Sequence, residues 1–375
     1  MSKKRITFLA ILVVMLVTSL ILLFNEKDRL IDRNIKKETA DGWEYVKLNN
    51  DSYNRDFIVI KGYSGKKKVD ELIIPGEIDG CEVLYFDGYL GTDLELGRLV
   101  IPYEIVEIRG SGMTMCSCKE VIFEEGSRLK TIGADSVLGI NDMEEIRLPD
   151  SLETIGEEAF AYAFNLKKVY LGANVTTIGD GAFYETKISD VEISPENKRF
   201  TYEDGLLVDK EENRLIAYDH EKYAESITIP SSIEFVDARC FDGRDLKWID
   251  VEEGNKVYKS INGCLYSKDG KVLYKVPRAM TQEDFILADG VEEFGRYAMK
   301  YGSVETVEVP DTVKKIDIFA LDSQEVYLPK EIEDVDLRSF TGNIYYKGTA
   351  EDWQKVFVNN GSNSPDAYGL FYLGE

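Results

Sequence analysis

The sequence contains little histidine, and it has none of the common catalytic motifs. His220 is the only histidine among 375 residues, which excludes most familiar catalytic arrangements. No GxSxG, HExxH, P-loop or GxGxxG motif occurs in a suitable context. Carboxylate pairs are plentiful, but with 69 acidic residues such pairs arise by chance. We therefore predict no enzyme, no catalytic residue and no cofactor.

Cysteine is also scarce. Five cysteines are an odd number for so long a chain, which excludes the disulfide framework of a small secreted domain. Cys116 and Cys118 lie close together, but no second pair accompanies them, so a zinc site is not predicted. No DxDxDG calcium loop occurs, which leaves open only a loose site of oxygen ligands. The sequence therefore predicts no metal site.

Positive charge is scarce relative to negative charge. The formal net charge is −24, from 45 basic and 69 acidic residues. Such a surface repels nucleic acid phosphates and anionic lipid headgroups, and it favours solubility in an aqueous, ion-rich compartment. We predict no nucleic acid partner.

One long apolar run stands near the amino terminus. Residues 6–24 carry no charge, and as a helix they would span about 28 Å, close to the thickness of a bilayer core. The cations Lys3, Lys4 and Arg5 precede this run, which favours a cytoplasmic amino terminus. We predict an uncleaved signal anchor, so that the protein is a single-pass membrane protein whose body lies outside the cytoplasm. The alternative is a cleaved signal peptide and secretion.

The rest of the chain is repetitive. Stretches such as SLETIGEEAFAYAFNLKKVYLG and NVTTIGDGAFYETKISDVEIS share one pattern, which ends in an aliphatic-x-x-aliphatic-x-aliphatic run. The median spacing is near 22 residues, within the range of leucine-rich repeats. The last position of the run falls at Ile74, Ile101, Phe123, Leu148, Leu171, Ile193, Ile229, Val251, Leu287, Val309, Leu328 and Tyr346.

Two spacings are longer, at 36 residues, and the two insertions match each other. NKRFTYEDGLLVDKEENRLIAYD starts at Asn197 and NKVYKSINGCLYSKDGKVLYKVP starts at Asn255. Alternating apolar residues surround polar turns at 210–213 and 268–271. The pattern predicts a β-hairpin within each insertion, at 197–222 and at 255–280.

Each unit is too short to enclose its own apolar side, so the units are expected to stack and bury continuous columns. The first predicted column is Leu152, Val175, Ile233, Val291, Val313 and Ile332. The second is Ile155, Ile178, Val236, Phe294, Ile316 and Val335. The third is Phe160, Phe183, Phe241 and Met299. Cys118 and Cys240 occupy core positions of the repeat and are predicted to be small core residues, whereas the roles of Cys81, Cys116 and Cys264 stay open.

The predicted organisation has five parts. They are a cytoplasmic stub and transmembrane segment at 1–24, a linker at 25–42, a capping hairpin at 43–66, the solenoid at 67–346 and a carboxy-terminal cap at 347–375. In the last part a helix should start at Thr349, with Trp353, Val356 and Phe357 covering the final repeat and an irregular finish from Asn359.

The chain resembles the BspA-like leucine-rich-repeat proteins of bacterial surfaces. The resemblance rests on IGEEAF and IGDGAF with their following strands, the paired insertions, the entry segment FIVIKGYSGKKKVDELIIPGEIDGCEVLYF and the closing IYYKGTAEDWQKV, and it covers roughly residues 43–357. It implies a curved solenoid at the cell surface that acts in adhesion or protein binding. The predicted fold is a β-rich α/β solenoid, a right-handed leucine-rich-repeat superhelix with short strands, two β-hairpin insertions and one amino-terminal transmembrane helix.

A partner would contact the residues that point outward between the aliphatic positions. Trp248 stands where other repeats carry mostly charged residues, and aromatic side chains are common interface anchors. The predicted partner-binding residues are Arg147, Tyr170, Trp248, Asp250 and Tyr327. In the alternative interpretation, Trp248 covers the base of the neighbouring hairpin insertion. The predicted function is protein binding or adhesion at the cell surface, and the alternative is a structural or assembly role in the envelope without a separate ligand.

Overall fold

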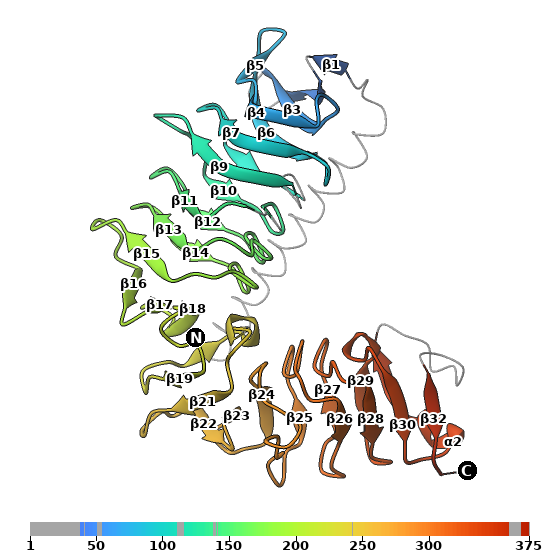
Figure 1. Ribbon diagram of the computed structural model, residues 1–375. Coiled ribbons are helices and arrows are strands. Elements are labelled where there is room, and N and C mark those ends of the chain that lie inside the picture. Colours follow the sequence, from blue (N-terminus) through green and yellow to red (C-terminus); the bar gives the residue numbers. More distant parts are fainter. Residues whose placement is uncertain are drawn as a thin grey trace, which may run out of the picture.

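The computed structural model describes residues 38–40, 42–50, 55–110, 116–137, 140, 142–241, 243–359 and 369–374 (Figure 1). The predicted stub and transmembrane segment at 1–24 lie outside the described residues, as does most of the predicted linker at 25–42. Among the residues that are described, no helix combines the length and the apolar character that a membrane span requires. This described part is a β-solenoid with one four-residue α-helix, α2 (Ala350–Trp353), so helix contributes less than an α/β class implies.

Most repeats contribute one strand to each of two β-faces, which we call face A and face B. Face A follows the predicted aliphatic-x-x-aliphatic-x-aliphatic runs and consists of parallel strands. Its strands are β4 (Lys68–Ile73), β7 (Glu95–Ile101), β9 (Ser117–Phe123), β11 (Glu145–Arg147), β13 (Lys168–Leu171), β15 (Asp190–Ile193), β19 (Ser226–Ile229), β21 (Trp248–Val251), β26 (Thr306–Glu308), β28 (Glu325–Leu328), β30 (Asn343–Tyr346) and β32 (Leu370–Tyr372). Those of face B are β6 (Cys81–Tyr89), β8 (Glu107–Ile108), β10 (Thr131–Ile132), β12 (Thr154–Ile155), β14 (Thr177–Ile178), β20 (Phe235–Val236), β25 (Glu293–Phe294), β27 (Lys315–Ile316), β29 (Asp334–Asp336) and β31 (Phe357–Asn359).

Equivalent residues of successive repeats pair directly with one another. On face B, Ile132, Ile155 and Ile178 lie in register on adjacent parallel strands. Because side chains alternate along a strand, all three point into the core, where they are buried. Each is followed by a glycine, and a Cβ added to Gly156 would lie 2.4 Å from the backbone nitrogen of Ala134. The repeats therefore stack more closely here than a larger residue would allow.

The predicted apolar columns form the core. Every member of the first and third columns is buried, and the rings of Phe160 and Phe183 stack with centroids 5.8 Å apart. In the second column Val236 is only half-buried. The second column is also interrupted, because Leu215 of the first insertion pairs with Val236 and Leu273 of the second insertion pairs with Phe294. The prediction of one continuous second column was therefore wrong at both insertions.

Both insertions contain a third strand that the sequence pattern missed. Their strands are β16 (Phe200–Glu203), β17 (Leu206–Asp209) and β18 (Arg214–Tyr218), and β22 (Tyr258–Ile261), β23 (Cys264–Ser267) and β24 (Val272–Lys275). Each set is an antiparallel meander whose last strand joins face B in parallel. A buried asparagine starts each one: the amide nitrogen of Asn255 donates to the carbonyl oxygens of Pro230 (3.0 Å) and Ile233 (2.9 Å), and Asn197 bonds in the same way. These bonds anchor the first strand to the preceding repeat.

Side chains of the insertions satisfy the strand edges that the interruptions expose. The Arg214 guanidinium donates to the carbonyl oxygen of Ile178 at the edge of β14. The Tyr258 hydroxyl accepts a hydrogen bond from the Val236 amide at the edge of β20, with a donor–acceptor distance of 3.2 Å. Because buried backbone groups require partners, these contacts allow face B to end and restart within the solenoid.

The insertions divide the solenoid into three packed blocks. The buried apolar residues form three clusters, and the boundaries between the clusters run through the two insertions. Figure 1 shows that the stack also bends there: β1 to β15 descend in one direction, whereas β24 to β32 run across in another. We call residues 38–193 the amino arm, 194–254 the central block and 255–374 the carboxy arm.

One predicted strand is missing. Leu287 was expected to end a face A strand, but residues 285–288 form none. The second insertion occupies the space beside β21, where the Ile249 amide donates to the carbonyl oxygen of Gly263 at 2.9 Å. The Asn262 amide nitrogen in the same turn donates to the carbonyl oxygen of Ile286 at 3.2 Å. The insertion therefore takes the pairing that a strand ending at Leu287 would have made.

Antiparallel strands close the amino end of the solenoid. β1 (Glu38–Ala40), β2 (Trp43–Asn50) and β3 (Arg55–Tyr63) pair in that order, and β3 then pairs in parallel with β6. The short β5 (Glu77–Ile78) pairs antiparallel with β6. This arrangement, antiparallel pairs followed by a parallel pair, is the one found in both insertions.

A short helix and two further strands close the carboxy end. The helix α2 starts after Thr349, as predicted, and the Thr349 and Asp352 side chains form a capping box there. Trp353 and Val356 are buried, but Phe357 is 65% exposed, so its predicted role in covering the last repeat was wrong. The irregular finish predicted from Asn359 was also wrong in part, because β32 extends face A. The remaining elements are the 3-10 turns η1 (Ala238–Phe241) and η2 (Leu337–Ser339).

Candidate partner-binding surface

Two predicted site residues of the amino arm touch each other on face A. Arg147 of β11 lies opposite Tyr170 of β13, and its guanidinium carbon is 3.7 Å from the ring centroid. Beside them Lys168 forms ion pairs with Asp190, at 3.2 Å, and with Glu192. The hydrogen bond from Lys168 lowers the pKa of Glu192. This patch is therefore a set of solvent-exposed charges arranged around one tyrosine ring.

Trp248 and Asp250 form a second pair, on β21 in the central block. The indole nitrogen of Trp248 donates to the Asp250 carboxylate at 2.9 Å, and 43% of the tryptophan surface is exposed. A Cβ added to Gly263 would lie 2.5 Å from the indole ring, so the ring covers the first turn of the second insertion. The alternative interpretation, in which Trp248 covers the base of the neighbouring insertion, predicts this packing. Nearly half of the Trp248 surface is nevertheless exposed and can contact a partner.

Tyr327 belongs to an aromatic ladder at the carboxy end of face A. Its ring stacks on Tyr345 of β30, with centroids 4.7 Å apart, and Tyr345 stacks on Phe371 of β32, with centroids 5.2 Å apart. The separations follow from the spacing of adjacent strands, about 4.8 Å. Desolvation and nearby Glu325 raise the pKa of Tyr327. Sequence reasoning missed Tyr345 and Phe371, although Tyr345 stands at the outward position next to the buried Tyr346.

The amino end of face A carries an apolar stripe that sequence reasoning also missed. Ile73, Val100 and Ile122 lie opposite one another in β4, β7 and β9, all pointing outward, and Ile73 is 52% exposed. The sequence does contain a signal for this stripe, because each of the three repeats has a run of three consecutive apolar residues: LII, LVI and VIF. A groove of about 1060 Å³ lies at β9 and β11, lined in part by Ile122 and Arg147. The stripe and the groove are continuous with the Arg147–Tyr170 patch.

The five predicted residues share one face but do not form one site. Arg147 and Tyr170 lie in the sheet of β11, β13 and β15, Trp248 and Asp250 in the sheet of β19 and β21, and Tyr327 in the sheet that ends with β32. The solenoid bends between these sheets (Figure 1), so face A carries separate patches on the amino arm, the central block and the carboxy arm.

The cysteines belong to the core. Cys118 and Cys240 are buried, as predicted, and so are Cys81, Cys116 and Cys264. Burial raises the pKa of the Cys264 thiol to about 12 and that of Cys116 to about 12. Such thiols are poor nucleophiles and poor metal ligands at neutral pH. Within the described residues, no group of three or more His, Cys, Asp or Glu side chains is arranged to hold a metal ion.

Two stacked β-faces built from units of about 22 residues define a leucine-rich-repeat solenoid. Six copies of the BspA type leucine rich repeat region match residues 90–203 and 279–347, so the repeats of these two segments are of the BspA type. The predicted family is therefore confirmed. A comparison with curated proteins gave no significant match.

The chain is also similar to solved bacterial structures. One is the pneumococcal vaccine antigen PcpA, at 17% identity over 91% of this chain and 98% of that chain, with a TM-score of 0.40. A second is a leucine rich cell surface protein from Faecalibacterium prausnitzii, at 14% identity over 87% of this chain and 99% of that chain, with a TM-score of 0.41. A third is a leucine-rich repeat protein from Eubacterium ventriosum, at 16% identity over 89% of this chain and 91% of that chain, with a TM-score of 0.45.

Proposed function

We propose that this chain is a cell-surface binding or adhesion protein that holds a partner protein against face A. The BspA-type repeats support a role in binding, and the apolar segment at 6–24 would attach the protein to the membrane with its solenoid outside the cytoplasm. The observation that carries the proposal is the aromatic ladder of Tyr327, Tyr345 and Phe371.

The ladder fits a protein partner better than a sugar. A carbohydrate platform needs exposed ring faces, whereas here the middle ring is covered on both sides. Among the described residues, only the end rings, Tyr327 and Phe371 (47% exposed), each have one face without a stacked ring. The ladder thus presents ring edges and hydroxyl groups in a row, which is how aromatic residues anchor protein interfaces. With a net charge of −24, the protein would associate faster with a neutral or cationic partner than with an anionic one.

The test compares ladder variants with a matched aromatic control. Proteins of the intact cell surface would be captured on the full chain carrying Tyr345→Thr or Phe371→Thr, which keep the β-propensity of the position, and on Tyr103→Thr, an exposed tyrosine (44%) outside the ladder. Each ladder variant should lose tenfold or more of the captured partner, about 1.4 kcal/mol per tenfold. The control should lose none. Equal capture by all three variants, with unchanged thermal midpoints, would contradict the proposal.

A structural or assembly role is the second candidate. It is favoured by three exposed apolar side chains at the carboxy end: Phe357 (65%) of β31, Phe371 (47%) of β32, and Leu373 (51%), which directly follows β32. If these residues hold copies of the chain together, sedimentation should show concentration-dependent association that Leu373→Ser abolishes. A monomer at all concentrations would exclude this role and leave binding of a different partner.

A further inference from the structure

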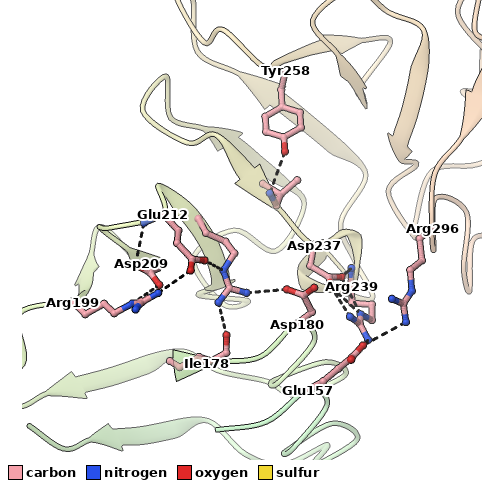
Figure 2. Close-up of polar contacts among 12 residues, drawn as sticks. Glu157, Ile178, Asp180, Arg199, Asp209, Glu212, Asp237, Arg239, Tyr258 and Arg296 are labelled. Carbon is pink, nitrogen blue, oxygen red and sulfur yellow. Dashed lines mark hydrogen bonds and ion pairs between the residues drawn. The ribbon is translucent and has the colours of Figure 1, made fainter. Parts of the chain in front are cut away.

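Loops from the three blocks meet at the inner side of the bend. Figure 2 shows the Glu157 carboxylate of the amino arm between Arg239 of η1 and Arg296 of the carboxy arm. The same Glu157 oxygen is 3.0 Å from Nη1 of Arg239 and 3.4 Å from Nη2 of Arg296. Arg239 also pairs with Glu158 of the amino arm, and its Nη2 is 2.6 Å from the Asp237 carboxylate. One carboxylate thus joins side chains from all three blocks.

Arg239 is the most buried member of this group. Its side chain has no exposed surface, while Glu157 retains 49% and Glu158 retains 20%. Burial alone would lower the pKa of Arg239, but hydrogen bonds and charge from Asp237 and Glu158 raise it. A buried charge of this kind is tolerated only while its partners stay in place.

Further contacts link the amino arm directly to the carboxy arm. Arg278 pairs with Glu185, whose side chain is only 6% exposed. The hydroxyl groups of Tyr162 and Tyr301 are 3.5 Å apart, and the Tyr184 ring stacks near Tyr301 with centroids 6.4 Å apart. The amino arm and the carboxy arm therefore contact each other directly at the inner side of the bend, with no residue of the central block between these side chains.

Five ion pairs among the described residues span the bend, and each joins a carboxylate of the amino arm to a guanidinium group beyond it. The amino arm supplies the carboxylates of Glu157, Glu158, Asp180 and Glu185. The central block and the carboxy arm supply the guanidinium groups of Arg239, Arg296, Arg214 and Arg278. The apolar clusters, by contrast, divide within the insertions. Charge attraction and tyrosine contacts therefore join the inner sides of the two arms.

We propose that the bend is a hinge, and that these cross-bend ion pairs hold it closed. Each insertion connects its blocks through a single antiparallel meander, so the blocks can rotate about it once the cross-bend contacts separate. Opening would change the angle between the amino-arm patch of face A, Arg147 with Tyr170, and the aromatic ladder of the carboxy arm. The hinge does not depend on the proposed function.

The test measures the distance between the arms in the full chain. Spin labels at Lys119→Cys in the amino arm and Asp311→Cys in the carboxy arm, both exposed positions, report it by double electron–electron resonance. In Arg239→Gln the distribution should move to longer distances by more than its wild-type width. In Lys247→Gln, which removes an exposed pair with Glu225 on face A, it should stay unchanged. High salt should move the wild type in the same direction but less far, because buried pairs are screened weakly.

A second set of variants covers the case in which Arg239→Gln does not fold. Arg296→Gln and Glu157→Gln alter half-exposed side chains, at 48% and 49%, and should fold normally by circular dichroism. Each should show a smaller shift to longer distances than a folded Arg239→Gln. If the folded variants show the same distance distribution between the spin labels as the wild type, the ion pairs do not hold the bend and the hinge is rejected.

Discussion

The amino arm and the bend are built from the same repeat but are stabilised differently. In the amino arm, identical residue types stack in register, such as Ile132, Ile155 and Ile178, and one apolar cluster runs through the whole stack. At the bend, insertions separate the strands of face B, and side chains such as Arg214 and Tyr258 satisfy the exposed edges. Regular stacking therefore depends on shape and apolar contact, whereas the bend depends on particular polar partners.

The largest expected effect tests the apolar stack. Ile155→Ala should lower the free energy of unfolding of the amino arm by about 3–4 kcal/mol, because it leaves a cavity in a fully buried column. Chemical denaturation monitored by circular dichroism measures it. A loss below about 1 kcal/mol would mean that the column is not packed as described.

A glycine comparison tests how closely the repeats stack. A Cβ at Gly156 would meet the Ala134 backbone nitrogen at 2.4 Å, but at the equivalent Gly295, which follows an insertion, the nearest atom is 3.2 Å away. Gly156→Ala should therefore destabilise the protein by about 2–3 kcal/mol and Gly295→Ala by less than about 1 kcal/mol. Thermal denaturation of both variants would measure the difference, and equal losses would contradict it.

A tyrosine pair tests how the bend satisfies its strand edges. Tyr258→Phe removes the hydroxyl that bonds the Val236 amide and the Glu234 carbonyl oxygen, which should cost about 1–2 kcal/mol. Tyr274→Phe is the matched control, because that ring packs against Tyr258 while no hydrogen bond of its hydroxyl is found among the described residues. If the denaturation midpoint falls equally in both variants, the Tyr258 hydroxyl does not stabilise the edge of β20.

A smaller effect at the bend depends on pH. Desolvation lowers the pKa of His220 to about 4. The unfolded chain, with a pKa near 6.5, binds the proton more readily, so stability should fall as the pH drops from about 6.5 to about 4 and level off below that. Because the imidazole is only partly buried, the loss should be about 1 kcal/mol. His220→Gln should remove this part of the pH dependence, and identical pH profiles would contradict it.

The sequence predicts the stack well because the stack is periodic. The columns through Leu152 and Phe160 recur at a fixed spacing, and one inward residue per repeat is enough to define each column. The insertions were also found, because a shared offset of 58 residues aligns Asn197 with Asn255. Their extra strands were missed, since the bonds of these two asparagines to the preceding repeat have no local pattern.

The polar contacts at the bend could not be predicted in the same way. Glu157 and Arg239 are 82 residues apart and occupy no shared repeat position, so only the folded chain brings them together. The candidate surface was predicted in part. Tyr327 stands at an outward position that the repeat defines, whereas Phe371 lies on a strand that follows the last recognisable repeat.

Hydrogen exchange on the full chain, followed by mass spectrometry of its peptides, tests the central claim most directly. If apolar columns stack within three blocks, amides of the paired strands should be protected, and protection should be lost in three steps whose boundaries fall within 197–222 and 255–280. Loss of all protection in a single step, or boundaries inside the amino arm, would contradict the division of this solenoid at its insertions.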